Sequence, residues 1–336
     1  MTTLLGRFNE MVDAVLGPAP PEQGKDHRLT FTDLFCGIGG FHVAGSNLGL
    51  DCVFASDIDA EVRAVYQRNF GLAPLGDIAS IPIEDIPDHD LLFAGFPCQP
   101  FSIIGRQLGF ADPRGTLFFE VSRILRARRP RGVVLENVKQ LTTAQGGDVL
   151  RHILKDLRGL GYTVDHRILN ALDFGLPQKR ERTIIVATLA PFKEFPWPRG
   201  AVPMLPLAEI LEPNPDRKHF VSERIRNKRH AAHTADFMPS IWHENKAGHI
   251  SSHAWSCALR AGASHNYLLV DGERRLTPRE LLRLQGFPDT FQMAENDSQT
   301  RKQAGNAVPV PLVQAVIEGV IHVLERSEVA RRSFTA

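Results

Sequence analysis

The stretch from Leu29 to Phe41, LTFTDLFCGIGGF, decides the fold. It begins with a short apolar run, passes through a glycine-rich turn and enters a segment whose apolar residues recur with helical spacing. A strand that leads through a tight turn into a helix is the first unit of a parallel α/β sheet. Glycine suits this turn because it lacks a Cβ and lets a ligand approach the backbone closely.

The same alternation continues to about residue 187. Apolar runs of strand length occur at Leu29–Phe35, Cys52–Ala55, Leu91–Ala94, Val133–Leu135, Val164–Leu169 and Thr183–Ala187, with a weaker run near Ala73–Leu75. Segments with helical spacing include Phe41–Leu48, Ala60–Asn69, Leu117–Ala127 and Val149–Leu157. The pattern predicts an α/β fold with a Rossmann-like, mostly parallel sheet that helices cover on both faces.

The sequence changes in character at Pro191. Proline is so frequent from there to Pro215 that neither a regular helix nor a central strand is expected. We therefore expect an N-terminal arm with a short amphipathic helix and a linker (1–27), an α/β domain (28–190) and a smaller inserted domain (191–272). The last segment (273–336) is expected to return to the α/β domain and to end in a helix over Leu312–Leu324.

Composition excludes several classes of protein. The chain has 336 residues and a net charge of +1, so nucleic-acid binding would require positive charge that is concentrated locally. No stretch approaches the roughly 18 apolar residues of a membrane span, and no secretion signal is recognisable. The four cysteines form no Cys-x-x-Cys pair, which disfavours a zinc ribbon. We expect a cytoplasmic protein without a metal or a membrane partner.

Polar and reactive residues follow several of the predicted strands. In an open parallel sheet, ligands bind outside the carboxyl ends of the strands, so these residues are expected to share one rim. They are Phe35–Gly40 after the first strand, Asp57 and Asp59 after the second, Gly76–Ile78 after the weak third run, Gly95–Gln99 after the next and Glu136–Val138 after the last.

The glycine turn and Asp57 indicate a cofactor. Asp57 lies about 20 residues beyond the turn, the spacing at which an acid bonds a ribose hydroxyl. The alternative is a tight strand-to-helix turn with solvated acids. A dinucleotide fingerprint requires a third glycine, but His42 occupies that position. The pattern therefore favours an adenosine cofactor without a pyrophosphate, such as S-adenosylmethionine.

Cys98 and Glu136 are the candidate reactive groups. Cys98 follows Pro97 on a predicted loop, where it is either a thiolate nucleophile or a small buried apolar side chain. Arg180 and Arg182 would supply positive charge to a thiolate if their loop reaches the rim; a solvated loop is the alternative. Glu136 ends an apolar strand, where burial favours a general acid, and a salt bridge to an arginine is the competing interpretation.

Taken together, six blocks in order resemble the cytosine-5 DNA methyltransferases, most closely those of bacterial restriction–modification systems. The match covers about Arg28 to Leu324. The blocks are Asp33–Gly40, Pro97–Gln99, Glu136–Val138, Gln178–Arg182, Arg275–Pro288 and Gly305–Val308. The resemblance implies the fold of S-adenosylmethionine-dependent methyltransferases, with 28–190 as the catalytic domain and 191–272 as the DNA-recognition domain.

The resemblance also implies roles for individual residues. The Cys98 thiolate would attack C6 of a flipped cytosine, Glu136 would engage N3, and Arg182 would hold O2 with Arg180 in support. Phe35 and Ile58 would sandwich the adenine of S-adenosylmethionine, Asp57 would bond its ribose and Asp77 its amino group. The residues expected to line the cofactor pocket are Phe35, Gly37, Gly39, Asp57, Ile58, Asp77, Ile78, Pro97 and Asn306.

The expected recognition domain contains the local charge that the net balance conceals. Residues 217–230 include six basic residues and the single acid Glu223. Such density suits phosphate contacts, although a solvated helix face is the alternative. The residues expected to bind DNA are Arg217, Lys218, Arg224, Arg226, Lys228, Arg229 and Arg260. We expect a monomer that acts on double-stranded DNA, with a cognate restriction endonuclease as a functional partner.

Three alternatives compete with this interpretation. The first is a tRNA cytosine-5 methyltransferase, because one branch of the family modifies RNA. The second is a catalytically silent DNA-binding relative, which the presence of Cys98, Glu136 and Arg182 disfavours. The third is a dinucleotide-dependent oxidoreductase, which His42 disfavours.

Overall fold

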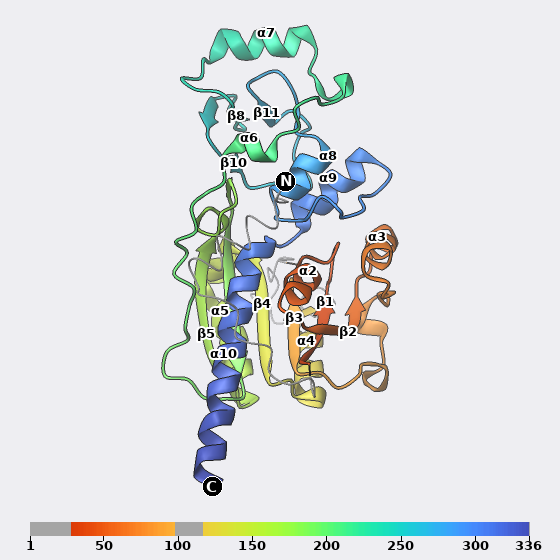
Figure 1. Ribbon diagram of the computed structural model, residues 1–336, viewed down its shortest axis with the longest axis vertical. Coiled ribbons are helices and arrows are strands. Elements are labelled where there is room, and N and C mark those ends of the chain that lie inside the picture. The colour runs from red at the N-terminus through yellow and green to blue at the C-terminus, as the bar shows by residue number, and fades with distance from the viewer. Residues whose placement is uncertain (1–27, 98–116, 336) are drawn as a thin grey trace. The chain divides into compact units, whose positions relative to one another are not determined.

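The computed structural model describes residues 28–97 and 117–335, and Figure 1 shows the course of the chain. These residues divide into two compact units. The larger unit contains the described residues up to Leu169, the segment Glu181–Arg199 and the chain from Leu312 onward. The smaller unit contains Asn170–Arg180 and Gly200–Pro311. The N-terminal helix predicted within residues 1–27 lies outside the described residues.

A six-stranded sheet forms the centre of the larger unit, in the order β2-β1-β3-β4-β7-β5. Its strands are β1 (Thr30–Leu34), β2 (Asp51–Ser56), β3 (Leu91–Ala94), β4 (Gly132–Val138), β5 (Thr163–Asn170) and β7 (Glu181–Thr188). Strand β1 pairs in parallel with β2 and β3, and β3 pairs in parallel with β4, whereas β7 runs antiparallel to β4. The predicted fold class, a mostly parallel α/β sheet, is confirmed.

Helices cover both faces of this sheet, which explains why its central strands are apolar throughout. The helices are α2 (Gly40–Asn47), α3 (Ala60–Phe70), α4 (Leu117–Arg128), α5 (Asp148–Gly159) and α10 (Val310–Thr335). Apolar residues of α4 and α5 form one continuous core with Leu92, Val133 and Ile185 of the strands. On the other face, Phe41 of α2 stacks on Phe93 of β3.

Local signals begin and end these helices where the sequence predicts. Asp59 is the N-cap of α3, and its carboxylate accepts the backbone N–H groups of Glu61 and Val62. Gly71 ends the same helix in a left-handed conformation with φ of 72°. The weak run near Ala73–Leu75 forms a single parallel bridge between Leu75 and Ser56 at the end of β2.

Contrary to the expectation from the sequence, one helical stretch, Asp297–Val329, is long and apolar enough to cross a membrane, but 78% of its apolar window is buried inside the protein. It includes most of α10, which packs on the sheet of the larger unit where Val320 and Leu324 approach Gly132 of β4. The stretch is therefore a core helix, and its length and hydropathy reflect burial in protein.

The smaller unit contains two small sheets. Strands β6 (Gln178–Lys179) and β10 (Ser256–Cys257) pair in parallel. Strands β8 (Ile241–Glu244), β9 (Ile250–His253) and β11 (Leu268–Val270) form an antiparallel sheet in the order β11-β8-β9. The helices of this unit are α6 (Leu207–Ile210), α7 (Glu223–Ala232), α8 (Pro278–Arg283) and α9 (Asp297–Asn306).

A buried ion pair fixes α8 in the smaller unit. Thr277 and Glu280 form a capping box at the start of α8. The Arg274 guanidinium donates to both carboxylate oxygens of Glu280 at 2.8 Å, and the Glu280 side chain has no exposed surface. The backbone N–H of Glu212 donates to the same carboxylate, which joins α8 to the chain that follows α6.

This division of the chain differs from the boundaries expected at residues 190 and 272. Residues 273–311 belong to the smaller unit, and only the chain from Leu312 joins the larger one. Residues 170–180 also belong to the smaller unit, although they lie within the expected α/β domain. The Arg274–Glu280 pair explains why the boundary expected at residue 272 is absent. It connects the start of the last segment to Glu212 in the smaller unit.

We predict that Gly132→Ala destabilises the larger unit. A Cβ at Gly132 would lie 2.6 Å from Cγ1 of Val320 and 2.8 Å from Cδ2 of Leu91, so the α10–β4 contact must open. The expected loss is about 1–3 kcal/mol in the free energy of unfolding, measured by urea denaturation. Gly159→Ala is the control, because a Cβ there meets nothing within 4 Å. Equal stability of the two variants would contradict this packing.

Candidate active site

The order of the strands locates a crevice at the carboxyl ends of β1 and β3. Strand β1 has β2 on one side and β3 on the other, so the chain leaves it in one direction and later returns on the opposite side. Ligands bind at such switch points because the adjacent loops diverge there. The turn that follows β1 begins at Phe35, and the segment that follows β3 leads through Phe96 to the exposed Pro97.

Three residues of the turn after β1 have a left-handed backbone: Phe35 with φ of 53°, Gly37 with 53° and Gly39 with 87°. A Cβ at Gly39 would collide with the Phe70 ring, whereas a Cβ at Gly37 would meet nothing within 4 Å. Gly39 is therefore required by close packing and Gly37 by backbone conformation. The open space at Gly37 leaves the backbone of the turn accessible to a ligand.

Asp57 is tied to this turn. Its carboxylate oxygens accept the backbone N–H groups of Gly37 and Asp59, each at 2.9 Å. Burial raises the pKa of Asp57 above its ordinary value, and the two backbone hydrogen bonds oppose that shift. The adjacent Ile58 is 73% exposed, a large apolar side chain with an open face beside the crevice. Asp57 and Gly37, predicted from separate motifs, are thus in direct contact.

Asp77 and Ile78 lie close to the end of β2 through the Leu75–Ser56 bridge. Asp77 caps a short 3₁₀ turn, with its carboxylate accepting the backbone N–H of Ala79 at 3.1 Å. Ile78 is 2% exposed and belongs to the hydrophobic core. The side chain of Ile78 therefore packs inward, and Asp77 is the polar group of this pair.

Behind the glycine turn lies a buried polar cluster that includes Asp33, His42 and Tyr66. The Nδ1 atom of His42 lies 2.7 Å from the Tyr66 hydroxyl, and the His42 ring stacks on Phe70. Burial lowers the pKa of His42 to about 4. Burial, with the Asp57 carboxylate nearby, raises the pKa of Asp33 well above its usual range. His42, which occupies the missing glycine position, thus supports the turn from beneath as a neutral ring.

Glu136 and Arg182 form an ion pair across neighbouring strands. Val138 of β4 is paired with Arg182 of β7, and Nε of Arg182 lies 2.7 Å from Oε1 of Glu136. The side chains are 10% and 12% exposed, so solvent screens this pair only weakly. The sequence analysis kept a salt bridge from Glu136 to an arginine as the alternative to a general acid, and this salt bridge is present. It also holds the Arg182 guanidinium beside the carboxylate at the carboxyl end of β4.

Asn137, next to Glu136, is a positioning residue that the sequence analysis did not single out. Its side-chain amide donates to the carbonyl oxygen of Phe96 at 2.9 Å, and both residues are buried. This bond ties the end of β4 to the segment that leads from β3 through Pro97 toward Cys98. Cys98 itself lies outside the described residues. Its place in the Glu-Asn-Val motif was the only feature of the sequence that could have pointed to Asn137. Its hydrogen-bond partner, Phe96, is 41 residues away in the chain.

The described cysteines are poor nucleophiles. Burial raises the pKa of Cys36 well above its usual range, that of Cys52 to about 12, and that of Cys257 to a lesser extent. These three side chains therefore stay as thiols near neutral pH. In the part of the chain that the structure describes, no group of three or more His, Cys, Asp or Glu residues is arranged to hold a metal ion.

Arg180 lies inside the smaller unit and is 1% exposed. Its guanidinium donates to the carbonyl oxygens of Leu259 at 3.0 Å, Gly305 at 3.1 Å and Ala307 at 2.8 Å. It thereby fixes the backbone on both sides of Asn306, whose own side chain is exposed at the end of α9.

Gln178 makes a similar connection two residues earlier. Its side chain donates to the carbonyl of Leu284 at 2.8 Å and accepts the backbone N–H of Leu259 at 3.0 Å. Gln178 and Arg180 together join three separate parts of the smaller unit.

The basic residues expected to bind DNA differ in their surroundings. Arg217, Arg224, Lys228 and Arg260 are exposed. Lys218 pairs with Asp297 at 2.8 Å, and Arg226 lies 3.7 Å from Glu273. Arg229 is 3% exposed and donates at 2.6 Å to Glu244 and to the carbonyl of Asn266. Because Glu244 already pairs with the Arg229 guanidinium inside the unit, we no longer expect Arg229 to contact a DNA phosphate.

Comparison with known proteins places these features in a family. Residues 29–322 match the family described as "C-5 cytosine-specific DNA methylase". The chain is 52% identical over 286 residues to the type II methyltransferase M.NgoBI of Neisseria gonorrhoeae, covering 84% of this chain and 90% of that protein. It is 51% identical over 296 residues to the type II methyltransferase M.HaeII of Haemophilus aegyptius, covering 87% and 92% respectively.

Solved structures share the fold. The Dnmt2 methyltransferase of S. pombe superposes with a TM-score of 0.69 at 24% identity, over 88% of this chain and 99% of that one. The Entamoeba histolytica methyltransferase EhMeth superposes with a TM-score of 0.71 at 19% identity, over 89% and 99%. At these identities the likeness concerns the fold alone.

We predict that His42 makes stability depend on pH below neutrality. Burial disfavours the imidazolium, so the folded pKa of about 4 lies below the unfolded value of 6.5. The unfolded state binds more protons between these values, and stability is lost as the pH falls. Between pH 7 and pH 5 the wild type should lose about 2 kcal/mol more than His42→Phe in urea denaturation. Parallel pH profiles of the two proteins would contradict this assignment.

We also predict that Arg180→Met destabilises the smaller unit by about 3–5 kcal/mol, because three buried carbonyl groups lose their donor. Arg180→Lys should lose less, since an ammonium group still donates. Lys179→Met is the matched control at the exposed neighbouring position and should stay within about 0.5 kcal/mol of the wild type. The measurement is thermal or urea unfolding, and a stable Arg180→Met variant would refute the role of this guanidinium.

Proposed function

The chain belongs to the C-5 cytosine-specific DNA methylase family and is a type II DNA (cytosine-5-)-methyltransferase, and from this premise we propose how its residues carry the reaction. The observation that carries the proposal is the Glu136–Arg182 pair, a carboxyl and a guanidinium joined at 2.7 Å. These two groups suit the N3 and O2 positions of a cytosine ring. The Asn137 bond to Phe96 ties the same strand end to the segment that precedes Cys98.

S-adenosylmethionine is the proposed cofactor, and the residues of the crevice fit it. Asp57 is held by Gly37 in a position to bond a ribose, and the open face of Ile58 suits an apolar contact with adenine. Phe35 and Gly39 shape the turn, and Asp77 is the acid available to the adenine amino group. Pro97 is proposed to lie near the methionine end, and the role of Asn306, which belongs to the smaller unit, stays a prediction from the sequence. When bound, this cofactor supplies an electrophilic methyl group.

The proposed reaction begins when the Cys98 thiolate adds to C6 of the target cytosine, and the electron pair of the C5–C6 double bond moves to C5. Glu136 donates a proton to N3 and Arg182 donates a hydrogen bond to O2, which offsets the negative charge that develops on the ring, and N3 returns the proton when Cys98 leaves. The methyl group transfers to C5. A water-mediated base then removes the C5 proton, and Cys98 leaves C6 as the double bond re-forms. The raised pKa values of Cys36, Cys52 and Cys257 support Cys98 as the nucleophile.

The smaller unit is proposed to recognise double-stranded DNA, with S-adenosylmethionine chemistry confined to the larger unit. Arg217, Arg224 and Lys228 offer exposed charge for phosphates, and Arg226 would exchange its present carboxylate partner for phosphate, while Lys218 stays paired with Asp297. The cytosine must leave the helix, at a cost of a few kcal/mol, before Cys98 can reach it. We further propose a cytoplasmic monomer whose functional partner is a restriction endonuclease of the same specificity.

Covalent trapping tests the proposed mechanism. The protein is mixed with S-adenosylmethionine and a duplex library that carries 5-fluorocytosine, whose C5–F bond blocks the final elimination. The expected result is a protein–DNA adduct at Cys98, identified by mass spectrometry and absent from Cys98→Ser. Glu136→Gln should slow adduct formation by about 10²-fold or more. Glu181→Gln is the matched control, because this exposed carboxylate pairs with Lys139 and should leave the rate unchanged.

Each remaining outcome contradicts a definite part of the proposal. An adduct with fluorinated tRNA and none with duplex DNA would overturn the DNA substrate. An adduct at a cysteine other than Cys98 would overturn the assigned nucleophile. Duplex binding without any adduct would indicate a catalytically silent reader of DNA.

A further inference from the structure

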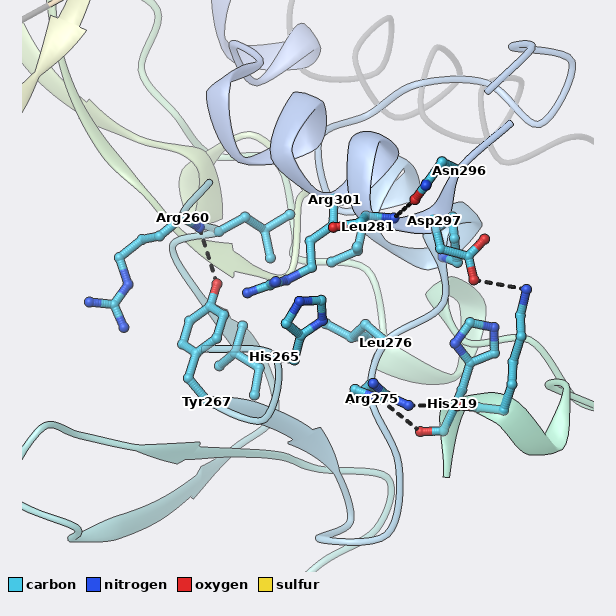
Figure 2. Close-up of a pocket in the computed structure, with 15 residues that line it drawn as sticks. His219, Arg260, His265, Tyr267, Arg275, Leu276, Leu281, Asn296, Asp297 and Arg301 are labelled. Carbon is cyan, nitrogen blue, oxygen red and sulfur yellow. Dashed lines mark hydrogen bonds and ion pairs between the residues drawn. The ribbon is translucent and has the colours of Figure 1, made fainter. Parts of the chain in front are cut away.

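The smaller unit contains a cavity of about 270 Å³ that the proposed catalytic chemistry does not use. Figure 2 shows its lining residues, with Arg301, His265 and Arg275 directed toward the same space. All of its lining residues belong to the smaller unit. They come from the turn at Lys218, from the chain between β10 and β11, from the start of α8 and from α9.

Cationic side chains outnumber acidic ones in the lining of this cavity. Its charged lining residues are the cations Lys218, Arg260, Arg275 and Arg301 and the single carboxylate Asp297. Asp297 is already bonded to Lys218 at 2.8 Å. Arg275 and Arg301 therefore contribute two guanidinium groups to a partly enclosed space whose single acidic side chain is bonded to Lys218, whereas the Arg260 guanidinium points away from them (Figure 2).

The cations are held in place by the backbone and by an aromatic ring. The Arg275 guanidinium donates to the carbonyl of Lys218 at 2.6 Å. The Arg301 guanidinium donates to the carbonyls of Ala263 and Ser264. The Arg260 guanidinium lies 4.8 Å from the centre of the Tyr267 ring. These contacts fix the positions of the guanidinium groups but leave their charge uncompensated by acids, so an anionic ligand would find them preorganised.

Mutual repulsion in the cavity agrees with an excess of positive charge. The charge of Arg301 is the main cause that lowers the pKa of His265, followed by burial and by Arg275. Burial lowers the pKa of Arg301 itself, and Arg275 adds to that effect. Such crowding is costly for the protein alone and becomes favourable when an anion enters.

We propose that this cavity is a phosphate-binding site that holds a phosphodiester group of bound duplex DNA. Arginine forks bind phosphate oxygens in pairs, and Arg275 and Arg301 offer two forks in one space. The side chains of Leu259, Leu276 and Leu281 add apolar lining, which suits the carbon atoms of the attached sugar. The inference rests on the proposed function in one respect, because it takes DNA as the source of the phosphate.

The salt dependence of duplex binding tests the site. Loss of one phosphate contact should reduce the magnitude of the slope of log K against log salt by about 0.9 and weaken binding about fivefold at 0.15 M salt. Arg301→Gln and Arg275→Gln should each show this change. Arg158→Gln, at an exposed position of α5, is the control and should keep the wild-type slope.

A double variant separates one shared phosphate from two independent contacts. If Arg275 and Arg301 bind the same phosphate, Arg275→Gln/Arg301→Gln should lose about as much slope as either single variant. Full additivity, with a slope reduced by about 1.8, would overturn a single shared site. A cooperative urea transition and an S-adenosylmethionine affinity equal to that of the wild type show that the variants are folded.

Competition with inorganic phosphate distinguishes the source of the ligand. Phosphate should compete with duplex for the wild type and should lose this effect in Arg301→Gln. Calorimetry could instead show that the protein binds phosphate while no variant changes the slope of log K for duplex binding against log salt. The cavity would then take free phosphate, and the proposal would fail. A wild type that binds duplex with a steep slope but never methylates it would refute the proposed function and leave the site intact.

Discussion

The buried guanidinium of Arg180 is the interaction on which the smaller unit depends. It donates to the carbonyls of Leu259, Gly305 and Ala307, which belong to two parts of the chain that are far apart in sequence. A buried cation is tolerated only when hydrogen bonds replace its hydration, and here three backbone oxygens do so. Close packing strengthens the same junction, because a Cβ at Gly305 would lie 2.5 Å from the backbone nitrogen of Ala261.

A second constraint is the covalent continuity of the chain where it passes from the smaller unit to the larger one. Gln178 and Arg180 belong to the smaller unit, whereas Arg182 belongs to the larger one and pairs with Glu136. Five consecutive residues thus supply the internal anchors of one unit and, in the other, the guanidinium that pairs with Glu136. A change in this stretch is expected to affect both units.

Local signals made most of the larger unit predictable from sequence. The apolar runs and helical spacing between Leu29 and Ala187 correspond to strands and helices whose ends differ by only a few residues. The link between Gly37 and Asp57 was also accessible, since a glycine turn followed by an acid at that spacing has a known physical purpose. Such features depend on neighbouring residues, and the sequence displays them directly.

Features that depend on distant partners were not predictable in this way. Arg229 lies in a basic stretch that favours DNA contact, yet Glu244 and the carbonyl of Asn266 hold it inside the unit. The Asn137 bond to Phe96 and the Arg274–Glu280 pair with Glu212 have the same origin. The roles of Cys98 and its loop stay predictions from the sequence, because they lie outside the described residues.

The most direct test of the whole account is to map 5-methylcytosine at single-base resolution. A random duplex library is incubated with the purified protein and S-adenosylmethionine, and the methylated positions are then determined by bisulfite sequencing. The account predicts that 5-methylcytosine occurs at one position within one short sequence and depends on added S-adenosylmethionine. Unmodified DNA, or methylation that is independent of sequence, would contradict it.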